Sequence, residues 1–350
     1  ERPEAFAEAE APAGRAYGLG RQELYPLIGG STSSLGSVAE IGVRGGDVIG
    51  RLDWLVLGAL AENGWPAGGA LAAAWRGWPV DVGFHLFRSE ERPTREEEVA
   101  RRGSLLDLER QGVELWATRD WQWSGGAVTV AARGLWNEVE QRTPLEQRVG
   151  SLGASWGGAR RWGKWRLQPA LSAHYEVGRT EGAPSWSRYG GAARLGLGYD
   201  STLLSLSWRR DASADLDRSY GFDLYQLGGP EVSILPETAL SGRIAVPALP
   251  VGALLGEDHE GQRAELALGF LPAPLFYERH RVWGRFTEPV AEEEWLSLAG
   301  LEYRFSVGPL PIGRLPALDV RVGVGRILED PFREFEDDDT RWWLITAWRP

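Results

Sequence analysis

Several residue types are missing or scarce, and each absence narrows the class of protein. The sequence contains no cysteine and no methionine, and Lys164 is its only lysine. The lack of cysteine excludes disulfide bridges, thiolate metal sites and cysteine nucleophiles. The net charge of −11, with no basic cluster to offset it, excludes a nucleic-acid partner. Because residue 1 is not methionine, we expect that a signal peptide has been removed.

Long hydrophobic runs are also missing. The longest uninterrupted apolar stretch covers the eight residues Trp54–Ala61, whereas a membrane-spanning helix needs roughly 18. The sequence therefore excludes a helical membrane protein. It leaves open a membrane β-barrel, because the signal of a barrel is alternation rather than continuous hydrophobicity. With 43% hydrophobic and 25% charged residues, the chain has the composition of a folded protein.

Apolar and polar residues alternate along many segments of the chain. In RLQPALSAHYEV, residues 166–177, every second residue from Leu167 to Val177 falls on one face. Twelve alternating residues exceed the usual strand length of about 5–6. The same pattern returns in residues 80–88, 194–200, 201–210, 263–270 and 318–325, with glycine, proline and charged clusters between them.

We therefore predict an all-β fold, an antiparallel barrel of about 16 consecutive strands. One long connection, residues 229–261, interrupts the series, and an alternative interpretation makes Leu240–Val246 a further strand. Residues 1–33 are predicted to be an N-terminal tail or linker, and residues 34–350 the barrel. The predicted strands are 34–44, 50–61, 66–76, 78–88, 106–121, 126–136, 146–157, 165–177, 188–199, 201–210, 218–228, 262–271, 275–286, 295–308, 317–328 and 340–348.

Three features favour a barrel in a membrane over a soluble β-protein with its apolar face packed inside. Tryptophans lie near predicted strand ends, as in the aromatic belts at membrane surfaces. Connections alternate between long, charged ones such as 89–104 and short ones such as 122–125. The chain ends in an amphipathic strand that closes on Trp348, which resembles the assembly signal of bacterial outer-membrane proteins. We expect the bacterial outer membrane as the location and its lipid as a partner.

The second half of the chain resembles the bacterial surface-antigen barrels, the superfamily of BamA and TamA, and in style the barrels that follow TolB-like propellers. In FDLYQLGG, residues 222–229, a strand would end in the paired glycines Gly228 and Gly229. LSGRIAVPALPVGALLG, residues 240–256, resembles the long loop of this family. QRAELAL, residues 262–268, resembles the first of five final strands.

This resemblance implies a long loop folded into the lumen. In the family that loop carries an arginine within a V-R-G-F/Y motif, which pairs with acidic side chains on the inner wall. Arg243 would take this position here, between Gly242 and Ile244. Glu265 and Glu278 are the candidate wall carboxylates.

The resemblance also implies a function in transport, or in insertion of proteins into the outer membrane or their passage across it. The alternative is a plugged, non-enzymatic structural barrel that binds other envelope proteins. A lipid-hydrolysing barrel is a third class, but no G-x-S-x-G elbow and no paired-histidine metal spacing occurs. We therefore predict no enzyme, no cofactor, no catalytic residue and no metal site. The acidic run at 329–339 is interpreted as a solvated hairpin tip, as charge runs usually are. A calcium site is the alternative, because clustered carboxylates suit a divalent cation, but the run lacks the spacing of a calcium loop.

Overall fold

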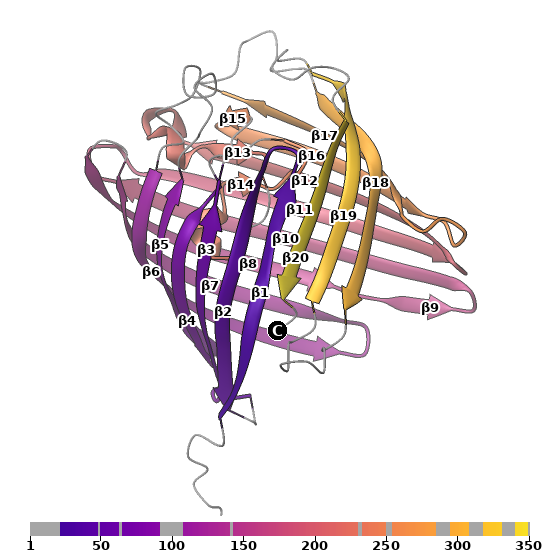
Figure 1. Cartoon of the computed structure of the whole chain (residues 1–350), viewed down its shortest axis with the longest axis horizontal. Helices are drawn as coiled ribbons and strands as arrows, with labels where there is room; N and C mark the ends of the chain where they lie inside the picture. Colours follow the sequence, from indigo (N-terminus) through magenta and orange to yellow (C-terminus); the bar gives the residue numbers. More distant parts are fainter. Residues whose placement is uncertain are drawn as a thin grey trace, which may run out of the picture.

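The computed structural model describes residues 22–47, 50–62, 65–91, 108–140, 143–229, 233–249, 254–284, 295–307, 318–330 and 340–348. Sixteen antiparallel strands form the wall of a closed barrel (Figure 1). They are β1 (Gln22–Ser33), β2 (Gly36–Asp47), β3 (Leu52–Ala61), β4 (Ala67–Trp75), β5 (Asp81–Glu91), β6 (Leu108–Trp123), β7 (Gly126–Glu140), β8 (Pro144–Gly157), β10 (Trp165–Thr180), β11 (Trp186–Tyr199), β12 (Thr202–Ala214), β16 (Asp258–Ala267), β17 (Leu275–Trp283), β18 (Leu296–Val307), β19 (Leu318–Glu329) and β20 (Thr340–Trp348).

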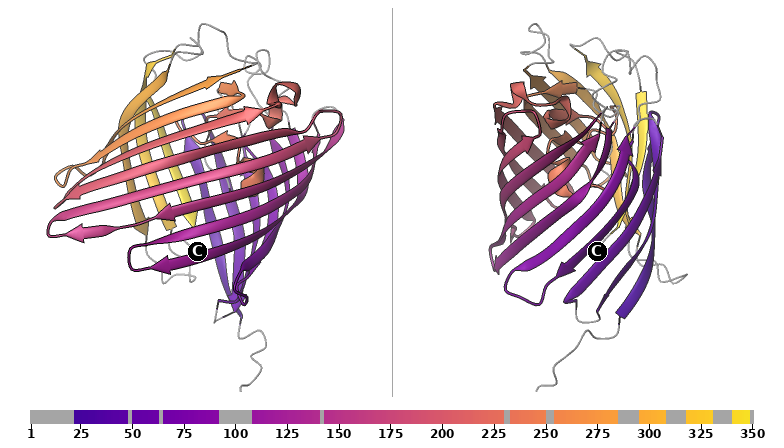
Figure 2. Two further views of the ribbon diagram at one scale, coloured as in Figure 1. Left: turned by 180° about the vertical axis from the view of Figure 1, so that it is seen from behind. Right: turned by 90° about the vertical axis from the view of Figure 1, so that its left-hand side faces the viewer.

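Each wall strand pairs with the next one along the chain, and β1 closes the ring by pairing with β20. A three-residue strand, β9 (Arg160–Trp162), follows β8 and pairs with the start of β10. The strands are strongly tilted, most visibly from β6 to β12 (Figure 2). Tilt is what allows a sheet to close on itself. Among the described residues, no helix has the length and hydrophobicity needed to cross a membrane.

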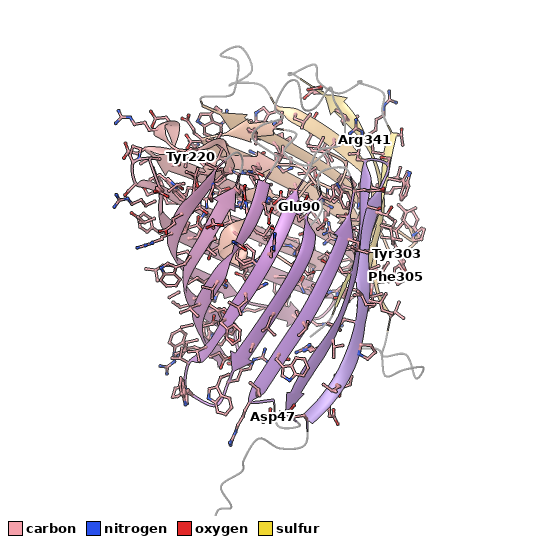
Figure 3. All side chains as sticks on the ribbon, turned by 60° about the vertical axis from the view of Figure 1, so that its left-hand side comes forward. Asp47, Glu90, Tyr220, Tyr303, Phe305 and Arg341 are labelled. Carbon is pink, nitrogen blue, oxygen red and sulfur yellow. The ribbon has the colours of Figure 1, made fainter. Side chains whose placement is uncertain are left out.

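The two faces of the wall carry different side chains. On β10, Leu171 and Tyr175 are 54% and 49% exposed and point outward, whereas the neighbouring Glu176 is 3% exposed and points into the barrel. On β18, Tyr303 and Phe305 project from the outer surface (Figure 3). Apolar side chains therefore cover the outside and polar side chains the inside, which is the arrangement of a barrel that spans a lipid bilayer.

The predicted number of sixteen strands is confirmed, but two errors cancel within it. Residues 22–33 form the wall strand β1, although the sequence assigned them to the tail. Residues 218–228 were predicted as a wall strand and lie outside the wall sheet. In the segment QELYPLIGGSTS the alternation is hard to recognise, because Pro26, Gly29 and Gly30 interrupt the series of apolar residues. FDLYQLGG supplies β13 (Tyr225–Leu227), the central strand of a separate small sheet.

Most of the long connections predicted at one end of the barrel lie outside the described residues. These are the greater parts of 89–104, 287–294 and 329–339, which include the acidic run. The described turns at the opposite end are short, as between Trp123 and Gly126. We call this opposite end, where β1 begins and β20 ends (Figure 1), the turn end, and the other end the loop end.

Candidate functional site

The chain between β12 and β16 forms a second, smaller structure, which we call the lumenal segment, residues 215–257. Its elements are η1 (Leu216–Arg218), η2 (Gly221–Asp223), β13 (Tyr225–Leu227), α2 (Glu237–Leu240), β14 (Arg243–Ile244) and β15 (Leu254–Gly256). The strand β13 pairs in parallel with β14 and antiparallel with β15, apart from the wall (Figure 1). Residues 240–246 are therefore not a wall strand, which was the alternative interpretation of this stretch.

Polar contacts join the lumenal segment to strands on all sides of the barrel. Two backbone N–H groups of the segment donate to wall carboxylates: Ser233 to Glu40 of β2 (3.0 Å) and Thr238 to Glu114 of β6 (2.9 Å). Three wall side chains contact carbonyls of the segment: His85 Nε2 of β5 that of Ile234 (3.1 Å), Arg188 of β11 that of Asp223 (3.2 Å), and Arg341 of β20 that of Ala248 (3.2 Å). Gln147 of β8 donates to the Asp223 side chain. A segment that touches β2, β6, β11 and β20 together lies within the ring of strands.

Apolar contacts hold the lumenal segment as well. Tyr225, Leu227 and Ile234 have no exposed surface. Leu227 belongs to a cluster of buried side chains that includes Leu298 of β18 and Trp343 of β20. Burial of a large apolar side chain is worth about 1.5–3 kcal/mol. The segment is therefore packed against the inner wall rather than loosely placed in the lumen.

Arg243 forms an ion pair with Glu91, the last residue of β5. The side chain of Glu91 is 1% exposed and that of Arg243 is 13% exposed, so the pair is shielded from bulk water. Both Glu91 oxygens accept hydrogen bonds from the same guanidinium nitrogen. Arg243 thus ties the lumenal segment to the wall at a point 152 residues away in the sequence.

The two carboxylates predicted as partners of Arg243 are engaged elsewhere. Glu265 and Glu278 both point inward from β16 and β17, and both pair with Arg263, at 2.7 Å and 2.6 Å. Arg263 also lies 3.3 Å from Glu302 of β18. These residues form an ion-pair network within the wall, so the structure does not bring Arg243 to the predicted partners.

A second anchor centres on Arg188, which is buried on the inner face of β11. Its Nε donates to Glu176 of β10 at 2.9 Å and its Nη2 to the hydroxyl of Ser241 at 2.6 Å. Its guanidinium also lies over the Tyr225 ring, 5.6 Å from the centroid. Nearby, Asp223 accepts hydrogen bonds from Gln147 and Thr180, and burial raises the pKa of Asp223. Arg188 thereby joins two wall strands to three parts of the lumenal segment.

Three glycines make these close approaches sterically possible. Gly228 and Gly229, the predicted glycine pair, have φ of 116° and 77° and donate to the carbonyls of Ile244 and Leu249. Only glycine adopts such angles without strain. A Cβ on Gly242 would lie 2.3 Å from Nη1 of Arg188. The glycine pair therefore ends the lumenal strand β13 rather than a wall strand.

Three of the four histidines gather on the inner wall, which the sequence did not reveal. His259 Nδ1 lies 3.0 Å from Asp211, His259 Nε2 lies 3.3 Å from His280 Nδ1, and His174 Nε2 lies 3.5 Å from Asp211. Their strands are distant in sequence, and only the register brings them together. Among the residues that the structure describes, no group of three or more acidic or histidine side chains is placed to hold a metal ion.

The junction between β1 and β20, which closes the ring, has fewer paired residues than either neighbouring junction. We call it the seam. Only four residue pairs form it, from Gly30↔Thr346 to Ser33↔Trp343. The neighbouring junctions β1–β2 and β19–β20 have twelve and nine pairs. On its β20 side, the ladder of β1 covers only Gly30–Ser33, although β1 itself begins at Gln22.

Gly30 marks the point where pairing at the seam begins. Its φ is 140°, and a Cβ there would lie 2.1 Å from the carbonyl oxygen of Val38. From Gly30 toward the turn end, β1 extends beyond its ladder with β20. The end of a ladder within lipid is a place where another strand can pair. The seam therefore has the chemistry of a strand-addition site.

Comparison with known proteins supports the architecture. No family model and no curated protein sequence matches the chain. Solved structures with a similar fold include BamA from Haemophilus ducreyi lacking POTRA domains 1–3 (TM-score 0.60, 10% identity, 93% of this chain and 70% of that one). CdiB from Acinetobacter baumannii is similar at TM-score 0.58 and 13% identity, over 93% of this chain and 60% of that one. CdiB from Escherichia coli is similar at TM-score 0.59 and 13% identity, over 93% and 67%.

The closed ring of sixteen strands, the apolar exterior and the shared fold define the class of this molecule. It is an outer-membrane β-barrel, with the architecture found in BamA and CdiB. The chain spans about 60% of the A. baumannii CdiB structure.

Proposed function

We propose that this barrel inserts proteins into the bacterial outer membrane or passes them across it, and that the seam is where a client strand pairs. The observation that carries the proposal is the four-pair closure of the ring between β1 and β20. Opening four antiparallel pairs disrupts fewer hydrogen bonds than opening either neighbouring junction. The fold shared with BamA and CdiB and the resemblance of residues 220–350 to surface-antigen barrels support the same assignment.

The lumenal segment has a distinct part in this proposal. A sixteen-stranded barrel encloses an aqueous space that wall side chains cannot fill. Anchored through Arg243 and Arg188, the segment blocks that space while the seam handles the client. A barrel of this design keeps small solutes out of the cell and still exchanges strands with a client in the membrane.

The absence of cysteine allows the seam to be tested by a disulfide lock. Ser31 and Ile345 are paired in register across the seam, and both are buried on the inner face. Directly opposed positions in an antiparallel pair lie close enough for a disulfide. Cysteines at both positions, once oxidised, should stop the barrel from accelerating insertion of a urea-denatured eight-stranded barrel protein into liposomes. Insertion is read from the altered gel mobility of the folded client.

A matched lock at another junction is the control. Cysteines at Val43 and Val56, paired between β2 and β3, should leave the acceleration intact after oxidation. Reduction should restore the activity of the seam-locked barrel. Full activity with the seam locked would refute the proposed role of the seam.

A plugged structural barrel that binds envelope proteins is the second candidate. The ring of contacts between the lumenal segment and β2, β6, β11 and β20 favours it. A scaffold of this kind would show no acceleration of client insertion in either the locked or the reduced state. Both candidates are plugged and should be non-conducting in planar bilayers, so the insertion assay is the measurement that separates them.

A further inference from the structure

The outer surface of β12, β16 and β17 changes abruptly from apolar to basic toward the loop end. On β17, the outward positions Leu275 and Tyr277 are followed by Arg279 and Arg281. On β12, Leu206 is followed on the same face by Trp208 and Arg210. Apolar side chains face the hydrocarbon of the bilayer, so this step lies at the level of the lipid headgroups.

The register gathers three guanidinium groups from these strands. Arg210, Glu260 and Arg281 are directly opposed across β12, β16 and β17. One step closer to the apolar band, Gln262 is opposed to Arg279. We call Arg210, Arg279 and Arg281 the arginine patch.

The arginines of the patch are only partly neutralised. Glu260 lies 2.7 Å from Arg281 but 3.9 Å from Arg210, a distance too long for a hydrogen bond. Arg279 donates to Gln262, a neutral side chain, at 2.8 Å and 3.1 Å. Asp258, the only other described carboxylate at these outward positions of β12, β16 and β17, accepts from the Ser213 N–H at 2.8 Å. Three cations thus face two carboxylates, and the side chain of Arg210 is 52% exposed.

Tryptophan rings hold the guanidinium planes in place. Arg279 and Arg281 lie 4.4 Å and 4.8 Å from the centroid of Trp295. Arg210 and Arg281 lie 5.6 Å and 5.3 Å from the centroid of Trp283. Stacking on indole rings fixes an arginine while leaving its N–H edges free to donate, which suits recognition of a phosphate group.

On the opposite side of the barrel, the outward residues at the corresponding level near the loop end are mainly acidic. There the outward positions near the loop end are Arg88 and Glu90 on β5, Glu109 on β6 and Glu138 on β7. Arg88 is already paired with Glu109. Other arginines also face outward near the loop end, among them Arg148 of β8 and Arg179 of β10. What distinguishes β12, β16 and β17 among the described residues is that three guanidinium groups stack on two tryptophan rings.

We propose that the arginine patch binds the phosphate groups of lipid A, the phosphorylated glycolipid of the outer leaflet. The occupant follows from three observations: the patch is at headgroup level, it faces outward, and it carries guanidinium donors with an excess of positive charge. The loop end, with its long connections, is the end expected to face outside the cell. This inference goes beyond the proposed function, because lipid binding at this rim does not depend on the seam.

The test uses the whole barrel in detergent with three lipids as probes: bisphosphorylated lipid A, its dephosphorylated form, and phosphatidylglycerol. Bound lipid is counted by native mass spectrometry. The wild type should bind bisphosphorylated lipid A more tightly than either of the other two. In the variant Arg279→Gln/Arg281→Gln, binding should fall by about fivefold for each charge removed. The matched control Arg88→Gln, in the opposite sector, should bind as the wild type does.

A second variant should raise the affinity for lipid A, and a gain of this kind cannot be explained by misfolding. Glu260→Gln removes the carboxylate that competes with phosphate, so it should bind lipid A more tightly than the wild type. Unchanged binding in Arg279→Gln/Arg281→Gln would overturn the proposal. Equal affinity for phosphatidylglycerol or for dephosphorylated lipid A would overturn it as well, because the patch would then not select the phosphorylated glycolipid.

Discussion

The variant Arg243→Gln removes the charge that anchors the lumenal segment while keeping a polar side chain in its place. Glu91 would remain buried, at 1% exposure, without its ion-pair partner. Breaking a buried pair on one side costs about 3–5 kcal/mol. The lower end of this range applies here, because the buried Arg110 is near enough to Glu91 to offset part of its charge. We therefore expect a loss of about 3 kcal/mol.

This loss should concentrate in the lumenal segment, because the wall strands keep their own ladder of hydrogen bonds. Amide hydrogen exchange of residues 233–249 should become about 100-fold faster, since a loss of about 3 kcal/mol multiplies the open population by roughly that factor. Exchange in β10 and β11 should change little. In planar bilayers the variant should conduct more ions than the wild type.

Two controls separate the anchor from general damage. Arg88→Gln breaks an ion pair whose arginine is 71% exposed, and an exposed pair contributes about 1 kcal/mol or less. The charge swap Arg243→Glu/Glu91→Arg should restore part of the protection lost in Arg243→Gln. If Arg243→Gln exchanges and conducts like the wild type, the ion pair does not hold the lumenal segment and the reasoning is wrong.

Four further predictions concern the wall and the interior. Leu171→Arg, on the lipid face, should destabilise the barrel by about 2–4 kcal/mol in a bilayer, whereas the inward Ser172→Arg should cost much less; refolding equilibria in liposomes measure both. Gly242→Ala should weaken the second anchor, because its Cβ would lie 2.3 Å from Nη1 of Arg188, and hydrogen exchange of Ser241 reads this directly. Because burial raises the pKa of Asp223 above its ordinary value of 3.8, its contribution to stability is present at low pH and is lost as the pH rises through the folded-state pKa; the wild type should therefore lose thermal stability relative to Asp223→Asn as the pH rises above 3.8. Protease added to intact cells should cut within the predicted loop 89–104, and cleavage seen only after the outer membrane is opened would reverse the expected orientation.

The wall was largely predictable from sequence because alternation records which side of a strand faces lipid. Residues 166–177 show this well: Leu171 and Tyr175 lie on the outer face and Ser172 and Glu176 on the inner face. Prediction failed where the alternation is incomplete. In β1, Leu24 and Ile28 face outward, but the inward Leu27 is apolar as well, and Pro26 and the glycine pair 29–30 interrupt the series. The sequence therefore assigned a wall strand to the tail.

The candidate site was much less predictable. The length and apolar composition of the connection after β12 pointed to a segment that returns to the lumen, and the resemblance pointed to Arg243. Neither observation could identify Glu91 as the partner, because the pairing depends on which wall strand the Arg243 side chain contacts. The histidine cluster around Asp211 was unpredictable for the same reason, since the registers of four wall junctions, from β10–β11 to β16–β17, set its geometry.

The central claim is that a client strand pairs at the seam, and the most direct test asks whether the client contacts β1 beside the seam. A photoreactive benzoyl-phenylalanine at Ile28, which is 59% exposed on the outer face beside the seam, is irradiated while a urea-denatured eight-stranded barrel protein inserts. The same residue at Leu195, outward-facing on β11, is the control. We predict a cross-link to the client from position 28 and none from position 195. Equal cross-linking from both positions, or insertion that proceeds with no cross-link at position 28, would contradict the account.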